Sequence, residues 1–183
     1  MRGEHAPASI SKMTIMKIKH MIAVSLLLLT GIRTANAVEW QMKQGPMMTP
    51  WSETLDPENV LGEYPRPQME RQEWMNLNGI WDLRKAIQDE AYSPDFIYDK
   101  KILVPFPLES AISGVMEESD NQCYWYRRTL TIPESMKGKN ILLHFDAVDW
   151  KAIVYVNGKK VGQHTGGYDP FYFDITSALT DGG

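Results

Sequence analysis

The chain has 183 residues, of which 43% are hydrophobic, and it carries a formal net charge of −4. This length and composition fit one ordinary globular domain and exclude a disordered chain. No basic run occurs, which argues against nucleic acid as a partner. Cys123 is the only cysteine, so no disulfide can form within the chain; its place in an apolar-rich strand predicts a buried structural thiol. The sequence holds no CxxC or HExxH motif and no acidic calcium loop, and it therefore predicts no metal site and no cofactor.

Residues 1–37 have the features of a secretory signal peptide with an over-long start. A basic region around Lys17 precedes the apolar run Met21–Leu29, and small residues follow at Ala35 and Ala37. Met16 opens a normal signal peptide by itself. A membrane anchor is the alternative, but the apolar run is shorter than the ~20 residues that span a bilayer. Cleavage after Ala37 would leave 14 Lys and Arg against 22 Asp and Glu, a net charge of −8. We expect a periplasmic or secreted product without a membrane span.

Residues 38–72 are rich in proline and contain few periodic apolar positions. Proline removes a backbone donor and fixes φ, so this composition predicts an extended arm lying over a domain surface. Trp40 and Trp51 are its expected anchors.

Residues 73–183 alternate between apolar and polar positions, as strands do. Asn157-Gly158 between two alternating runs is the strongest hairpin pattern, because both turn residues must reach positive φ. No segment shows an amphipathic helical period. These patterns predict an all-β fold, an antiparallel jelly-roll β-sandwich, in which the visible strands fall short of the about eight that such a sandwich uses. The expected strands begin after Asn78-Gly79 and include Lys101–Val104, Gln122–Ile132, Ile141–Phe145, Ala152–Val156, Lys159–Thr165 and Phe171–Ile175.

Several blocks of this region resemble the sugar-binding jelly-roll domain that opens family 2 glycoside hydrolases, which is similar to galactose-binding domains. The resemblance runs from about Pro65 to Gly183, and its pattern is nearest to the glucuronidase-like branch. It is carried by FDAV…VxVNG…H.GGY.PF.FDIT between His144 and Ile175, by Val104-Pro-Phe-Pro107 and by Tyr124-Trp-Tyr-Arg-Arg128.

The resemblance implies a domain that breaks no bond itself. Family members hydrolyse terminal β-linked sugars of oligosaccharides or polysaccharides with retention, using two glutamates on a separate (β/α)8 barrel of about 250 residues. We therefore expect no catalytic residue in this chain, an incomplete sandwich truncated at its C-terminal end, and a fragment that is inactive and unstable alone. The alternative is a free-standing carbohydrate-binding or adhesion module, against which the abrupt end argues; a purely structural sandwich is a third possibility. The acids in polar loops, Glu109, Glu117, Glu118 and Glu134, are expected to be solvated surface groups.

The glycine-rich loop Thr165–Pro170 is the candidate binding element. The resemblance implies that His164, Tyr168 and Asp169 lie near bound sugar; a tight turn between sheets is the plainer role of the two glycines. Gly166 stands where large bacterial β-galactosidases carry an acidic residue that reaches sugar and a cation, which disfavours contacts of that type. A sugar-contacting Asp of the glucuronidase branch falls beyond Gly183. The aromatic faces of Trp125 and Trp150 could stack on sugar, although a strand Trp is more often part of the core, and Asp146 and Asp149 are expected to form turns.

Overall fold

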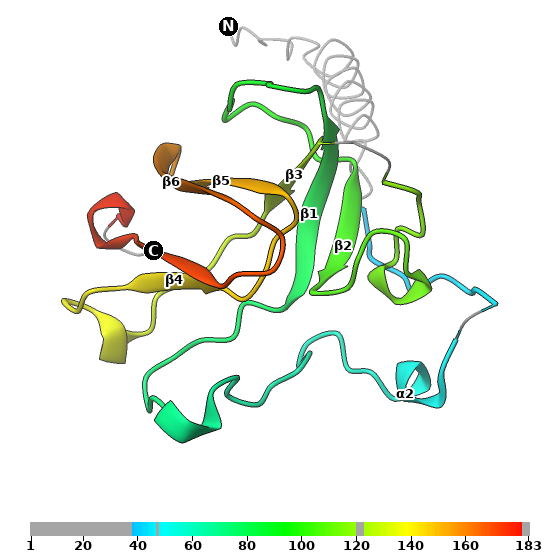
Figure 1. Ribbon diagram of the computed structural model, residues 1–183, viewed down its shortest axis with the longest axis horizontal. Helices are drawn as coiled ribbons and strands as arrows, with labels where there is room; N and C mark the ends of the chain where they lie inside the picture. The colour runs from blue at the N-terminus through cyan, green and yellow to red at the C-terminus, as the bar shows by residue number, and fades with distance from the viewer. Residues whose placement is uncertain (1–37, 47, 120–122, 181–183) are drawn as a thin grey trace, which may run out of the picture. The chain divides into compact units, whose positions relative to one another are not determined.

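The computed structural model describes residues 38–46, 48–119 and 123–180, which form seven strands and a few short helical turns (Figure 1). The expected signal peptide lies outside the described residues. The strands are β1 (Gly79–Ala86), β2 (Lys100–Val104), β3 (Cys123–Arg127), β4 (Leu142–Phe145), β5 (Lys151–Val156), β6 (Lys159–Thr165) and β7 (Phe171–Asp174). The helical turns are α2 (Pro50–Glu53), η1 (Pro67–Met69), η2 (Ala111–Ser113), η3 (Glu134–Met136) and η4 (Thr176–Ala178).

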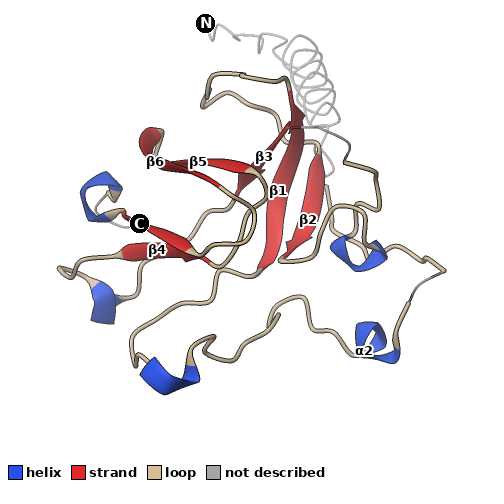
Figure 2. Cartoon of the chain, viewed as in Figure 1, coloured by secondary structure: helices blue, strands red, loops and turns tan. Residues whose placement is uncertain are grey.

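All strand pairs are antiparallel, in the orders β2-β1-β3, β4-β7 and β5-β6 (Figure 2). The fold is the antiparallel jelly-roll β-sandwich that the sequence predicts. One predicted strand is longer than the observed one: β3 ends at Arg127 instead of continuing to Ile132. The Arg128 guanidinium donates hydrogen bonds to the carbonyls of Leu77 (2.8 Å) and Asn78 (2.7 Å), which ties the chain to the segment before β1.

Both faces of the sheet β2-β1-β3 make contacts that depend on its register. On one face Leu83 and Ile102 are fully buried and pack with Leu108 and Val115 from the following loop. On the other face Asp82 lies opposite Lys101 on β2 and Arg127 on β3, so one carboxylate joins two cations across three strands. Because strand side chains alternate between faces, a one-residue slip would break both sets of contacts.

An aromatic cluster connects β3 to β5 through the loop after β1. The ring centroids of Trp125 and Tyr155 lie 5.7 Å apart, and the Tyr92 ring stacks on Tyr155 at 4.9 Å. Phe96 packs on Trp125 at 5.3 Å. The Trp125 indole donates a hydrogen bond to Glu90 Oε2 at 3.0 Å, which satisfies its only donor. Trp125 is therefore a packing residue, in agreement with the commoner role of a strand Trp.

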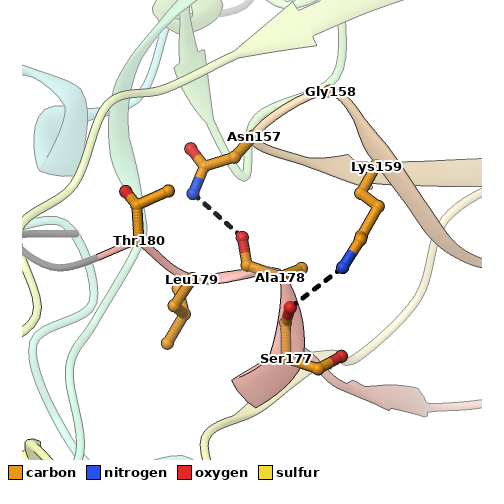
Figure 3. Close-up of a pocket in the computed structure, with 7 residues that line it drawn as sticks. All are labelled: Asn157, Gly158, Lys159, Ser177, Ala178, Leu179 and Thr180. Atoms are coloured by element: carbon orange, nitrogen blue, oxygen red, sulfur yellow. Dashed lines mark hydrogen bonds between the residues drawn. The ribbon is translucent and has the colours of Figure 1, made fainter.

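The predicted hairpin is present, with Asn157 at φ 48° and Gly158 at φ 78° between β5 and β6. Asn157 Nδ2 donates to the Ala178 carbonyl (3.0 Å) and Lys159 Nζ to the Ser177 carbonyl (3.0 Å), so the turn holds the helical turn η4 (Figure 3). Between them lies an open pocket of about 360 Å³. Its lining comes from Asn157, Gly158, Lys159, Ser177, Ala178, Leu179 and Thr180.

The expected anchors of the arm behave differently from each other. Trp40 donates from Nε1 to the Ser113 carbonyl at 2.8 Å, and it lies so close to Gly114 that a Cβ there would be 2.4 Å from the indole nitrogen. Trp51 is 79% exposed, so the prediction that it is an anchor is wrong. Its helix α2 buries Ser52 instead, whose hydroxyl bonds to the Thr49 carbonyl.

The prediction of a buried thiol is also wrong, because Cys123 is exposed. It is the first residue of β3 and lies opposite Ala86, the last residue of β1. At this end of the sheet, nothing in the described part of the chain covers the sulfur.

Candidate functional site

Two loops that are joined by a backbone hydrogen bond form the candidate site. One follows β4 and contains Asp149 and Trp150, which are joined by a cis peptide bond; the other connects β6 to β7 through Gly166 and Gly167. The Gly166 amide donates to the Trp150 carbonyl at 2.8 Å, which fixes one loop on the other. Gly166 has φ +133°, a conformation that side-chain-bearing residues rarely adopt.

The second glycine is required for space. A Cβ on Gly167 would lie 2.7 Å from Asp149 Oδ1 and 3.2 Å from Asp149 Cβ. The two loops therefore approach so closely that a larger residue at position 167 would force Asp149 to move. The two glycines thus form a tight turn, which is the plainer role that the sequence predicts for them. The turn gives Tyr168 and Asp169, which follow it, a defined position. The sequence predicts only a turn at Asp149, because the contact with Gly167 joins two loops that are separated along the chain.

The residues at the surface of the two loops are aromatic and acidic. Tyr168 is 95% exposed and Trp150 is 65% exposed. Asp149 and Asp169 are exposed as well. Aromatic faces offer apolar contact with a polar rim, and carboxylates accept hydrogen bonds from hydroxyl groups. Groups of these two kinds can bind a sugar ring. Trp150 is an exposed residue of the loop before β5, whereas a Trp within a strand more often belongs to the core.

His164 differs from the other two residues of the predicted site. It belongs to β6, lies opposite Ala152 on β5, and stacks its ring on Phe171 with centroids 4.3 Å apart and planes 14° apart. Tyr168 and Asp169 extend into solvent, whereas His164 is half-buried at the base of the loop. Tyr168 and Asp169 thus lie in the loop between β6 and β7, and His164 lies in β6 just before this loop. Their contact with sugar stays a prediction.

The other candidate acids have local partners or lie exposed. Glu117 forms an ion pair with Lys100 at 2.5 Å, and Glu134 pairs with Lys137. Ser119 donates a hydrogen bond to Glu109, which holds the pKa of that carboxyl below its usual value. Glu118 is exposed. In the described ranges no three His, Cys, Asp or Glu residues are grouped so that they could hold a metal ion, and no helix there is long and apolar enough to cross a membrane.

A family model described as glycosyl hydrolases family 2, sugar binding domain, matches residues 64–183. The chain belongs to this family. The match includes every strand of the sandwich and both loops of the candidate site.

Curated relatives of this family 2 chain are glycosidases. It is 36% identical over 111 residues to a β-galactosidase of Thermoanaerobacter pseudethanolicus, covering 59% of this chain and 15% of the relative. It is 27% identical over 125 residues to a β-glucuronidase of Paenibacillus borealis, covering 65% of this chain and 21% of the relative. The chain therefore spans about a fifth or less of the length of these relatives.

A solved structure supports the fold of the family 2 domain. The β-glucuronidase from Ruminococcus gnavus in complex with C6-substituted uronic isofagomine aligns with a TM-score of 0.52. The alignment covers 66% of this chain and 21% of that one, at 20% sequence identity. At this identity the likeness shows a shared fold.

Proposed function

We propose that this chain is the non-catalytic sugar-binding domain of a glycoside hydrolase that removes terminal β-linked galactose- or glucuronate-like sugars from oligosaccharides or polysaccharides. The single observation that carries this proposal is the family match over residues 64–183, which includes the loop pair with its exposed Trp150 and Tyr168. The relatives that cover part of this chain are a β-galactosidase and β-glucuronidases.

The proposed enzyme hydrolyses its substrate with retention of configuration. Retention requires two carboxyl groups about 5–5.5 Å apart. Within the described residues, Glu109, Glu117 and Glu134 each have a local partner, and Glu118 is a solvated surface acid. We place the catalytic pair on the separate barrel that the family resemblance implies, and the present domain contributes to substrate binding.

The proposed enzyme acts outside the cytoplasm. The basic start, short apolar run and small residues at Ala35 and Ala37 support export with cleavage before Val38. Expression with its own leader, followed by N-terminal sequencing of the exported product, tests this proposal. A product that stays in the membrane fraction and retains Met16 would contradict it.

Binding of simple glycosides tests the proposed function directly. Titration of the ¹⁵N-labelled chain with methyl β-D-galactoside and methyl β-D-glucuronide should shift the amide signals of the two loops. Replacing Trp150 or Tyr168 by Ala should weaken binding about three- to tenfold, because each removes one aromatic contact. Tyr172→Ala is the matched control, since Tyr172 is an exposed tyrosine (61%) on β7 outside the loop pair.

Two results would overturn the proposed function. The first is the lack of any loop response to either glycoside at millimolar concentration. The second is turnover of nitrophenyl β-glycosides by the purified chain above a mock preparation, which would show that a catalytic pair lies within these 183 residues.

A further inference from the structure

His164 carries a buried polar atom that has no hydrogen-bond partner. Within the part of the chain that the structure describes, its Nε2 is the one side-chain nitrogen or oxygen in this condition. Buried polar groups in folded proteins are almost always hydrogen-bonded, and leaving one unpaired costs free energy. An orphaned atom at this position therefore needs an explanation.

The surroundings of His164 do not require a nitrogen. Its ring packs on Phe171, whose other ring neighbours are Phe145 at 4.8 Å and Phe173 at 5.6 Å. A phenylalanine at position 164 would make the same stack without burying a polar atom. The histidine thus lowers stability relative to the apolar ring that the site would accept.

The orphaned nitrogen lies under the binding loop. The nearest atom to a Cβ built on Gly166 is His164 Nε2, at 3.4 Å. Gly166 is attached through its amide to the Trp150 carbonyl, and it precedes the exposed Tyr168 by two residues. Apart from the chain neighbours of Gly166, Nε2 is the one heavy atom of the described residues within 4 Å of that Cβ position, so a glycine here leaves the approach to the nitrogen free of a side chain.

We propose that His164 is a binding residue, whose Nε2 forms a hydrogen bond with a hydroxyl group of the saccharide held by the loop pair. This inference rests on the proposed sugar-binding function. A neutral imidazole nitrogen can donate to or accept from a hydroxyl group, according to its tautomer. The bound saccharide would supply the partner that the free protein lacks.

The test compares His164→Phe with His164→Gln and with the control His144→Phe. His144 is a second strand histidine; it lies on β4, and its ring contacts Tyr172 at 5.2 Å outside the loop pair. Each variant of the full chain is titrated with methyl β-D-galactoside and methyl β-D-glucuronide and is melted thermally. His164→Phe should melt at or above the wild-type temperature yet bind about tenfold more weakly, while His164→Gln should recover part of the affinity.

Imidazole ¹⁵N signals provide a readout that a merely structural role would not move. Saccharide should shift the His164 Nε2 resonance of the wild-type chain and leave that of His144 unchanged. Wild-type binding with an unmoved His164 resonance, or with unchanged affinity in His164→Phe, would overturn this inference and leave the proposed function standing. If the wild-type chain binds neither glycoside, the proposed function fails, and this inference fails with it.

Discussion

Asp82 and Arg127 face each other across β1 and β3, and the carboxylate accepts two hydrogen bonds from the guanidinium, at 3.0 Å from Nε and 2.9 Å from Nη2. Its second oxygen accepts a hydrogen bond from Lys101 Nζ at 2.5 Å. Partial burial opposes ionisation of Asp82, but the hydrogen bonds and charges of Lys101 and Arg127 outweigh it and hold its pKa below the ordinary 3.8. This row of charges crosses all three strands of the sheet.

The first prediction concerns the pH dependence of this contact. A depressed carboxyl pKa stabilises the fold above the ordinary value, and that stabilisation is lost as the pH falls through the folded-state pKa. Asp82→Asn should therefore reduce the free energy of unfolding by about 1–2 kcal/mol at pH 7. The difference from the wild type should shrink below pH ~4. Urea unfolding at several pH values measures it.

The control for this experiment is Glu134→Gln. Glu134 pairs with Lys137 three residues later, and its side chain is 85% exposed. Exposed pairs of this kind contribute little, so the variant should unfold like the wild type within about 0.5 kcal/mol. If Asp82→Asn and Glu134→Gln changed the free energy of unfolding equally, the ion pairs of Asp82 with Lys101 and Arg127 would not stabilise the fold as predicted.

Much of the sandwich could be predicted because its strands are marked by local rules. The strand at Tyr124, Trp125 and Tyr126 can be predicted from the alternation of these residues alone. The turn at Asn157-Gly158 can likewise be predicted locally, because both turn residues must adopt positive φ. Both features are present where the sequence places them. The glycine-rich loop could be recognised for the same reason.

The contacts between segments far apart in sequence could not be predicted in this way. Glu90 looks like any loop carboxylate until the fold places it beside Trp125, 35 residues away. The exposure of Trp51 and Cys123 depends on which surfaces other segments cover, and composition carries no information on that point. The orphaned nitrogen of His164 likewise becomes visible only when its neighbours are known.

The second prediction concerns the close approach of Gly167 to Asp149. Gly167→Ala would place a Cβ within 2.7 Å of Oδ1, and the rigid Asp149 Cβ at 3.2 Å limits relief by side-chain rotation. We expect a loss of about 1–3 kcal/mol in the free energy of unfolding, the usual range for overpacking. Chemical denaturation measures it, and glycoside titration should show weaker binding.

The control for Gly167→Ala is a variant that removes the two closest atoms, Oδ1 and Cγ of Asp149, and keeps its Cβ. In an Asp149→Ala background the carboxylate is absent, so most of the effect of Gly167→Ala should disappear in a double-mutant cycle. Gly138→Ala provides a second comparison, since Gly138 has positive φ (72°) and open space around it. That variant should cost about 1 kcal/mol through backbone conformation alone and leave glycoside binding unchanged.

The third prediction concerns Glu90, which joins the aromatic cluster to β1. It accepts hydrogen bonds from Trp125 Nε1 at 3.0 Å and from Arg84 Nη1 at 3.2 Å, and the Arg84 guanidinium also lies 4.2 Å from the Phe96 ring centroid. Glu90→Gln removes the charge that pairs with Arg84 and should lower the free energy of unfolding by about 1.5–3 kcal/mol. Tryptophan fluorescence during urea unfolding provides the measurement.

Glu117→Gln is the matched control for Glu90→Gln. Glu117 also pairs with one basic residue, Lys100, but the two side chains are 47% and 37% exposed, against 19% and 20% for Glu90 and Arg84. Its loss should change stability by no more than about 0.5 kcal/mol. If the two variants were equally stable, the half-buried position of Glu90 would have no energetic consequence.

The last prediction concerns the attachment of the arm. Trp40 buries part of its indole against Gly114 and donates to the Ser113 carbonyl at 2.8 Å, whereas Trp51 is 79% exposed. Trp40→Ala removes both the packing and the hydrogen bond, at about 2–4 kcal/mol for a half-buried large side chain. Since Lys43 is the next arm residue bonded to this loop, through its amide to the Ala111 carbonyl (3.0 Å), loss of Trp40 should free residues 38–46. Limited proteolysis should then cleave the chain near Lys43 at least tenfold faster, while Trp51→Ala leaves the rate unchanged. Equal rates in the two variants would show that the arm is held by contacts other than the Trp40 indole.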